Sequence, residues 1–242
     1  MNKINFETDQ INVFLLLIDC SGSMEDEYSA MISGLNEYKE KIIKFSKEEG
    51  ISLAIAKSMF NQDYIEGDFL DPEDMDTSYY ADGRTAMYDA IHRAKMQLDE
   101  YVSEVIHVNG VKPKVTFTLF TDGLSNNDKG EDYKKIALED IATMNDLNFT
   151  TVFIAFGEAI KAKTGKELGF QSTIDVNNRN ILKDFLVDEL SKSTMEQSRS
   201  IHPLGSNFFS KATYGEESEK ISNKAKEALE DRKWLGEIFF GK

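Results

Sequence analysis

The feature that most constrains the fold is the regular alternation of short apolar runs with longer amphipathic segments. Residues 12–18 (NVFLLLI), 115–120 (VTFTLF) and 150–156 (TTVFIAF) are rich in aliphatic and phenylalanine side chains over almost their whole length. Runs of this kind are typical of strands that are buried on both faces of a sheet. Between the first two, residues 27–47 place apolar side chains three and four positions apart, which predicts an amphipathic helix.

Six strands are predicted in all. They cover residues 12–18, 51–60, 64–70, 115–120, 150–156 and 172–176. Further helices are predicted to begin at Thr85 and to cover residues 131–145, 158–168 and 180–190. This order predicts an α/β fold that is doubly wound, with a mostly parallel six-stranded sheet flanked by helices. In such sheets, ligands bind beyond the carboxyl ends of the strands.

The chain is expected to form one domain over residues 1–196, followed by a tail over residues 197–242. Within the tail, residues 216–232 predict an amphipathic helix, and an apolar cluster follows at residues 234–240. Because such a cluster is seldom left in water, two arrangements stay open. The tail either packs back on its own domain or docks to a partner or a second copy of the chain.

Charge and cysteine content exclude several classes of function. The chain has 28 Lys and Arg against 43 Asp and Glu, which gives a net charge of −15. Nucleic acids and anionic membrane surfaces require clustered basic side chains, so neither is expected as a partner. The single cysteine, Cys20, permits neither an internal disulfide nor a cysteine-based zinc site. Residues 1–10 lack the apolar run of a signal peptide, so the expected location is cytoplasmic.

Three separated loops carry oxygen-bearing side chains where a strand ends or a helix begins. The first predicted strand runs into Asp19-Cys20-Ser21-Gly22-Ser23, which places one carboxylate and two hydroxyls on a tight turn that the glycine allows to close. Thr85 opens a predicted helix, and Asp122 follows the strand at residues 115–120. Hard oxygen ligands of this mixture suit Mg²⁺ or Mn²⁺ rather than zinc.

In these residues the chain resembles the von Willebrand factor A (VWA) family and its metal-ion-dependent adhesion site. The family pattern is Asp-x-Ser-x-Ser, a distant Thr and a distant Asp. It is matched in order by Asp19, Ser21, Ser23, Thr85 and Asp122, within a resemblance that covers about residues 10–195. The resemblance implies that these five residues bind one divalent cation. A looser resemblance links the chain to small stand-alone VWA proteins of bacteria that are associated with tellurium resistance and stress response.

Two further residues are candidates for the rim of the ligand site. Arg84 stands where many VWA relatives have Gly, and it either favours an acidic ligand beside the metal or is an ordinary solvated side chain. Asn126 lies shortly after Asp122, where ordinary loop composition is the alternative explanation. Cys20 fills a variable position of the motif and is expected to point toward the core.

The predicted function is recognition of a protein partner through the metal, without catalysis. Three hydroxyls and at most two carboxylates leave a divalent ion under-neutralised, so an Asp or Glu of the partner is expected to complete its coordination. One alternative is a structural scaffold that docks or self-associates through its tail, with the metal only stabilising the loops. A third is a metal-dependent phosphatase, which requires a second Asp two residues after the first as general acid. Ser21 stands at that position.

Overall fold

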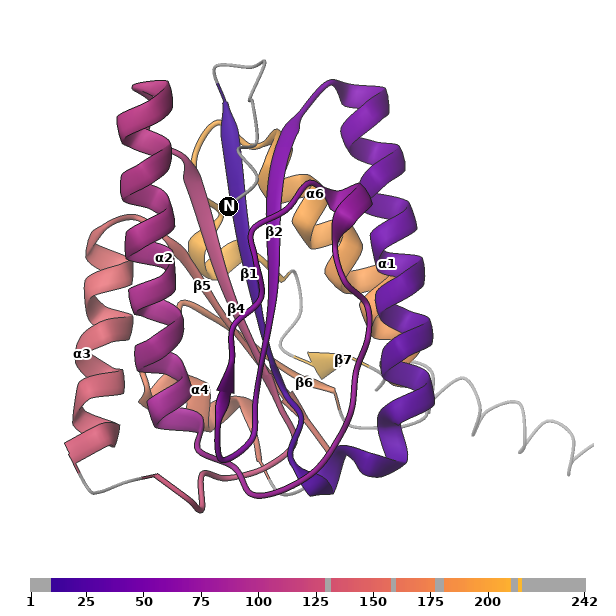
Figure 1. The fold of residues 1–242 in the computed structure, drawn as a ribbon, viewed down its shortest axis with the longest axis vertical. Helices are drawn as coiled ribbons and strands as arrows, with labels where there is room; N and C mark the ends of the chain where they lie inside the picture. The colour runs from indigo at the N-terminus through magenta and orange to yellow at the C-terminus, as the bar shows by residue number, and fades with distance from the viewer. Residues whose placement is uncertain (1–9, 129–131, 158–159, 177–180, 210–212, 215–242) are drawn as a thin grey trace, which may run out of the picture.

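A seven-stranded sheet lies at the centre of the computed structural model, which describes residues 10–128, 132–157, 160–176, 181–209 and 213–214. The strand order is β3-β2-β1-β4-β5-β6-β7, as Figure 1 shows in part. The strands are β1 (Ile11–Asp19), β2 (Ser52–Phe60), β3 (Tyr64–Ile65), β4 (Lys114–Thr121), β5 (Thr150–Phe156), β6 (Ser172–Val176) and β7 (Thr213–Tyr214). All neighbouring strands are parallel except β2 and β3 at one edge. The predicted doubly wound, mostly parallel fold is therefore confirmed, and β7 is added to the six predicted strands.

Helices cover both faces of the sheet (Figure 1). One face carries α1 (Tyr28–Glu49), α5 (Leu182–Asp184) and α6 (Ser191–Arg199), and the other carries α2 (Met87–Asn109), α3 (Asp132–Asp146) and α4 (Ala162–Glu167). Strand β1 is buried along its whole length, and its side chains alternate between the two apolar cores. Leu15 belongs to the core under α2 and α3, while Phe14 and Leu16 belong to the core under α1. This explains why the run has no polar alternation.

The strand order reverses direction at β1, because β2 lies on one side of it and β4 on the other. The loops that leave the carboxyl ends of β1 and β4 therefore diverge to opposite faces of the sheet and leave a crevice between them, where ligands of such folds bind. Asp19 ends β1, and Thr121 ends β4. The residues of the predicted metal motif thus meet at the carboxyl edge, at the bottom of Figure 1.

Several predicted elements have different bounds in the structure, and the helix expected over residues 158–168 covers Ala162–Glu167. The helix expected to begin at Thr85 begins at Met87, and the strand expected over residues 64–70 is reduced to Tyr64–Ile65 with a separate bridge between Leu70 and Ile55. The last helix of the domain continues past Leu190 through a π-helical segment (Phe185–Leu190) and α6 to Arg199.

The described part of the predicted tail packs on the domain. The expected boundary after residue 196 falls inside α6, and the next residue, Gln197, is fully buried and donates a hydrogen bond from Nε2 to Thr150 Oγ1 at 3.0 Å. Phe208 and Phe209 are buried in the core beneath α1. The amphipathic helix predicted over residues 216–232 and the apolar cluster after it lie outside the described residues. No helix in the described part of the chain has the length and apolar character needed to cross a membrane.

Candidate metal centre

The turn after β1 forms the base of the candidate site. Asp19 is fully buried, and its Oδ1 accepts a hydrogen bond from the backbone N–H of Ser21 at 2.8 Å, which folds the chain back sharply at the strand end. Ser21 is buried and Ser23 is exposed, and their hydroxyl oxygens lie 3.2 Å apart. A 3-10 helix, Gly22–Glu27, begins within the turn and leads into α1. The turn therefore places two hydroxyls side by side between a buried carboxylate and the surface.

Backbone hydrogen bonds join this turn to the loop that carries Thr85. The N–H of Gly22 donates to the carbonyl of Gly83 at 3.1 Å, and the N–H of Asp82 donates to the carbonyl of Cys20 at 2.8 Å. Gly83 has φ of +79°, and a Cβ built there would lie only 2.0 Å from Oε1 of Gln62. A larger residue at this position would be strained by the left-handed backbone and would displace the side chain of Gln62, so the glycine suits this path of the loop.

The third loop, after β4, brings Asp122 against the first turn. Ser23 Oγ donates a hydrogen bond to Oδ1 of Asp122 at 2.7 Å. A Cβ built on Gly123 would lie 3.8 Å from Ser23 Oγ and 3.9 Å from Thr85 Oγ1. Both hydroxyls therefore face the same small region beside Gly123. The structure thus brings together all five residues that the sequence singled out, from loops far apart in the chain.

The pKa of Asp19 departs strongly from its ordinary value. Burial raises its pKa to about 6, although hydrogen bonds from Ser21 and Thr121 act in the opposite direction. The negative charge of Asp122 adds to the increase. A buried carboxylate whose ionised form is disfavoured in this way is stabilised by a cation placed next to it. The electrostatics of the site therefore fit a bound divalent metal.

Two residues that sequence reasoning missed hold Asp19 in place. Thr121 donates from Oγ1 to Oδ2 of Asp19 at 2.6 Å, and Tyr79 donates from its hydroxyl to the backbone carbonyl of Asp19 at 2.7 Å. Thr121 directly precedes the predicted ligand Asp122, so its position in the sequence could have identified it as part of the site. Tyr79 lies in an acidic loop with no recognisable motif, and only the folded chain shows its role.

Asn126 holds the Thr85 loop in place through two hydrogen bonds. Its side-chain Oδ1 accepts a hydrogen bond from the N–H of Thr85 at 3.0 Å, and its own N–H donates to the carbonyl of Thr85 at 2.9 Å. Arg84, the other predicted rim residue, is exposed, and its backbone N–H donates to Oε1 of Gln62 at 2.9 Å. The structure thus gives Asn126 a structural contact, and it leaves Arg84 at the surface next to the site.

The loop after β4 also caps α2. Ser125 Oγ accepts a hydrogen bond from the backbone N–H of Met87 at 2.9 Å. Oδ1 of Asp128 accepts hydrogen bonds from the backbone N–H groups of Tyr88 and Asp89, each at 3.1 Å. These are the N–H groups that a helix leaves without partners at its first turn. Residues of the loop after β4 therefore fix the start of α2, the helix that follows the Thr85 loop. These hydrogen bonds join the two loops at this edge of the sheet.

The donor set of the site consists of two carboxylates and three hydroxyls. Such oxygen ligands match the preference of Mg²⁺ and Mn²⁺. Within the described ranges, no group of three or more His, Cys, Asp or Glu side chains is placed to bind a metal, so a site here depends on the hydroxyls. Cys20 does not take part, because it is fully buried in the core beneath α1, where burial raises its pKa to about 12.

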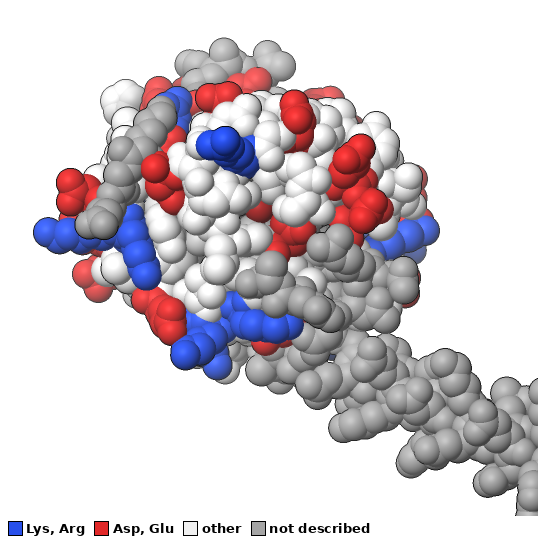
Figure 2. Space-filling view, turned by 90° about the horizontal axis from the view of Figure 1, so that it is seen from below, with Lys and Arg blue, Asp and Glu red and all other residues white. Residues whose placement is uncertain are grey.

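The surface around the site is mixed in character. Viewed from the end where these loops lie, Figure 2 shows both acidic and basic side chains around a broad uncharged area. Next to Ser23, a hollow of about 430 Å³ is lined by residues that include Glu25, Asp26, Tyr28 and Tyr80. The rings of Tyr28 and Tyr80 are both nearly half exposed. A partner that approaches the candidate site would therefore meet aromatic and acidic groups beside it.

Known proteins resemble this chain in structure and not in sequence. No protein-family model matches the chain, and no curated protein matches its sequence. The pilus adhesin SpaC from Lactobacillus rhamnosus GG superposes with a TM-score of 0.62 at 12% identity, covering 78% of this chain and 31% of SpaC. A von Willebrand factor type A protein from Catenulispora acidiphila gives 0.52 at 18% identity, covering 77% of this chain and 43% of its own.

The manganese-loaded TRAP protein of Plasmodium vivax superposes with a TM-score of 0.51 at 16% identity, covering 74% of each chain. This chain spans less than half the length of SpaC and of the Catenulispora protein. At these identities the likeness establishes the fold alone. The chain therefore has the fold of VWA domains, as the resemblance at the sequence level implied.

Proposed function

We propose that this chain is a metal-dependent protein-interaction module that binds a carboxylate of a partner protein through Mg²⁺ or Mn²⁺. The observation that carries the proposal is the convergence of three loops at one exposed edge. They bring together the carboxylates of Asp19 and Asp122 and the hydroxyls of Ser21, Ser23 and Thr85. No catalytic role is assigned to any of these residues.

The chemistry of these groups supports recognition rather than simple structural binding. Mg²⁺ takes six oxygen ligands and gives up water reluctantly, so a site with only two carboxylates retains positive charge and exchangeable water. When bound, the metal supplies a Lewis-acidic position for an outside Asp or Glu. Ser23 is exposed while Asp19 is buried, so the site is anchored on one side and accessible on the other. A partner carboxylate can therefore approach from the side of Ser23.

Known proteins of this fold offer further support. TRAP was solved loaded with manganese, and SpaC is a pilus adhesin. The manganese in TRAP is consistent with a divalent cation in this fold, and the adhesin SpaC is consistent with a binding role. We place the chain in the cytoplasm, with a protein partner that presents Asp or Glu. A bacterial stress-response setting remains part of the proposal, on the looser resemblance stated above.

Calorimetry with Mn²⁺ and Mg²⁺ tests the metal, and capture from a lysate of the source organism tests recognition. We expect metal binding that Asp19→Ala abolishes. We also expect partner capture in Mg²⁺ that is lost both in chelator and with Asp19→Ala. Asp26→Asn is the matched control for the calorimetry, because it removes an exposed carboxylate near the turn and is expected to preserve metal binding.

The outcomes also separate the competing hypotheses. Capture that survives chelator and Asp19→Ala would support the scaffold that docks through residues 197–242, and would contradict recognition through the metal. Turnover of a phosphate ester that Asp19→Ala abolishes would support the phosphatase. If a partner is captured as expected, replacing its contacting Asp or Glu with Asn or Gln must release it.

A further inference from the structure

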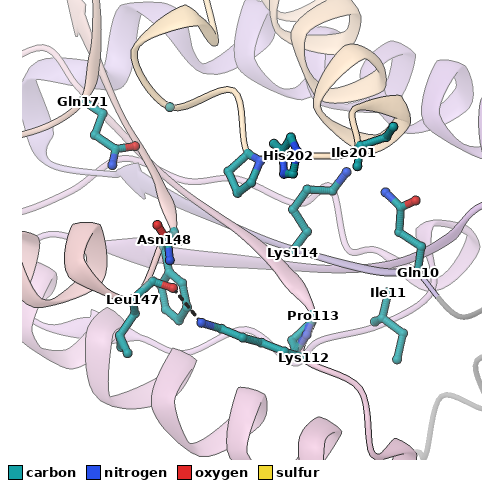
Figure 3. A pocket seen from close by; sticks show the side chains of 13 residues that line it. Gln10, Ile11, Lys112, Pro113, Lys114, Leu147, Asn148, Gln171, Ile201 and His202 are labelled. Atoms are coloured by element: carbon teal, nitrogen blue, oxygen red, sulfur yellow. Dashed lines mark hydrogen bonds between the residues drawn. The ribbon is translucent and has the colours of Figure 1, made fainter.

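A second cavity lies at the opposite edge of the sheet, where the strands begin. It has a volume of about 610 Å³ and is lined by residues at the starts of β1, β4, β5 and β6, together with residues 201–205 (Figure 3). This volume is within the range of small-molecule sites, roughly 300–1,000 Å³. Because the candidate metal centre lies at the carboxyl edge, this cavity is a separate feature of the molecule.

The cavity is basic in an otherwise acidic chain. Among the described residues, its lining includes Lys112, Lys114 and His202, and it includes no Asp or Glu. Within the described residues, neither lysine forms an ion pair with a carboxylate. In a chain of net charge −15, two ammonium groups that have no carboxylate partner in the described part of the chain favour an anionic ligand.

The partners of Lys114 among the described residues are neutral groups. Its Nζ donates to the backbone carbonyls of Ser198, at 3.2 Å, and Ser200. An ammonium has three N–H donors, so these two bonds leave one for a ligand. Partial burial lowers the pKa of Lys114 to about 8, which shows that its charge is poorly solvated. Lys112 bonds similarly to the carbonyl of Leu147 at 2.9 Å, so both side chains are already oriented (Figure 3).

The remaining walls are largely apolar. Pro113, Pro203 and Phe149 contribute to the lining, and Ile201 is 88% exposed at its margin. An isoleucine so fully exposed gains from contact with an apolar group. Three amides, of Gln10, Asn148 and Gln171, also line the cavity, and Oε1 of Gln171 has no hydrogen-bond partner among the described residues. The cavity therefore combines fixed cations, apolar walls and a few polar groups, as ligand sites do.

We propose that this cavity binds a small carboxylic acid with an apolar body, its carboxylate against Lys114 and its body against Ile201 and Pro203. The proposal is independent of the function proposed for the metal centre. Benzoate and benzamide are suitable probes, because they have nearly the same shape and differ in charge. The titration is followed by backbone amide shifts of residues 112–114 and 201–205. It is run in EDTA, so that benzoate cannot bind through a metal at the other edge.

We expect saturable shifts with benzoate and at least tenfold weaker binding of benzamide. Lys114→Gln should lower the affinity for benzoate at least tenfold and leave the affinity for benzamide unchanged. Lys134→Gln, an exposed position at the far end of α3, is the matched control and should change neither. If thermal melting shows that Lys114→Gln is unfolded, Lys112→Gln is used instead, because Lys112 is exposed. This variant should lower the affinity for benzoate at least threefold.

Equal affinity for benzoate and benzamide would overturn the proposal, because the cations would then play no part. The proposal would also be overturned if Lys134→Gln and Lys114→Gln lowered the affinity for benzoate equally. The loss would then come from the change in the net charge of the protein and not from the cavity. Inorganic phosphate that binds as tightly as benzoate would show that the apolar walls contribute nothing, and would likewise reject a carboxylic acid ligand.

Discussion

Ser23 and Asp122 are 99 residues apart in the chain, and a hydrogen bond of 2.7 Å joins the serine Oγ to a carboxylate oxygen of the aspartate. This single bond connects the loop after β1 to the loop after β4. It also shows that the two groups can share one small partner, because their oxygens already lie within the span of a metal coordination sphere.

The first prediction concerns the ligand set. Ser23→Ala should weaken Mn²⁺ binding about tenfold or more, and Asp122→Asn should weaken it further because it removes a charge. Isothermal calorimetry measures both. Asp26→Asn should have an affinity close to that of the unmodified protein. If Ser23→Ala and Asp26→Asn bind the metal equally well, the hydroxyl of Ser23 is not a ligand.

The second prediction concerns the residue behind Asp19. Thr121→Val removes the hydrogen bond to Asp19 without removing any proposed ligand, so Mn²⁺ affinity should fall by about 10- to 100-fold. Unfolding free energy should fall by about 1–3 kcal/mol, since a buried carboxylate loses a donor. Urea denaturation and calorimetry check the two effects.

Thr116→Val on the same strand is the matched control. The hydroxyl of Thr116 is buried and has no hydrogen-bond partner among the described residues. Its removal is therefore expected to leave stability unchanged or slightly raised, and to leave metal affinity unchanged. Equal behaviour of the two valine variants would contradict the positioning role of Thr121.

The third prediction concerns Gly83. Gly83→Ala places a methyl group on the side chain of Gln62 in a left-handed backbone conformation, so it should displace the Thr85 loop and weaken Mn²⁺ binding. Gly50→Ala, at the end of α1, has a similar φ of +64° and open space around it. It should lower stability by about 1 kcal/mol without changing metal affinity. A comparable loss of affinity in both would indicate general destabilisation.

The fourth prediction concerns acid sensitivity. Lys57 is a buried lysine of β2, and its Nζ donates to Oδ2 of Asp76 at 2.9 Å and to the carbonyl of Ser78. Partial burial acts to raise the pKa of Asp76, but hydrogen bonds from Ser78 and Lys57 outweigh it and lower the pKa to about 2. A carboxyl whose pKa is lower in the folded state stabilises the fold above its unfolded pKa of about 3.8.

That contribution is lost as the pH falls from about 4 toward 2. Because Asp76 is largely exposed, we expect only about 1 kcal/mol after screening. The difference in unfolding free energy between the unmodified protein and Asp76→Asn should be largest above pH 5 and should shrink below pH 4. Urea denaturation at several pH values measures it. A difference that stays constant across this range would show that the ion pair does not titrate as described.

Much of the fold was predictable because apolar periodicity reports burial directly. The strands β1, β4 and β5 are buried on both faces and so appear as apolar runs in the sequence. The end of the last helix was missed for the opposite reason. Among the residues that α6 buries are Ser191, Thr194 and Gln197, which no apolar pattern can reveal.

The candidate site also combines features that a sequence pattern reveals with features that it does not. Its five predicted residues carry a motif, so their grouping could be predicted, whereas the start of α2 could not. Thr85 does not cap that helix, because its N–H bonds to Asn126 and the next residue, Ala86, has a non-helical conformation with ψ of +62°. Such contacts between distant loops depend on the folded chain, and no local sequence pattern encodes them.

The burial of Phe208 and the pairing of β7 with β6 have a practical consequence for shortening this protein. A chain cut after residue 196 would lose part of α6 and uncover the apolar surface beneath α1. It would also leave β6 with an open edge, which invites pairing between molecules and hence precipitation. Truncated versions intended for binding measurements should therefore keep every residue through Tyr214.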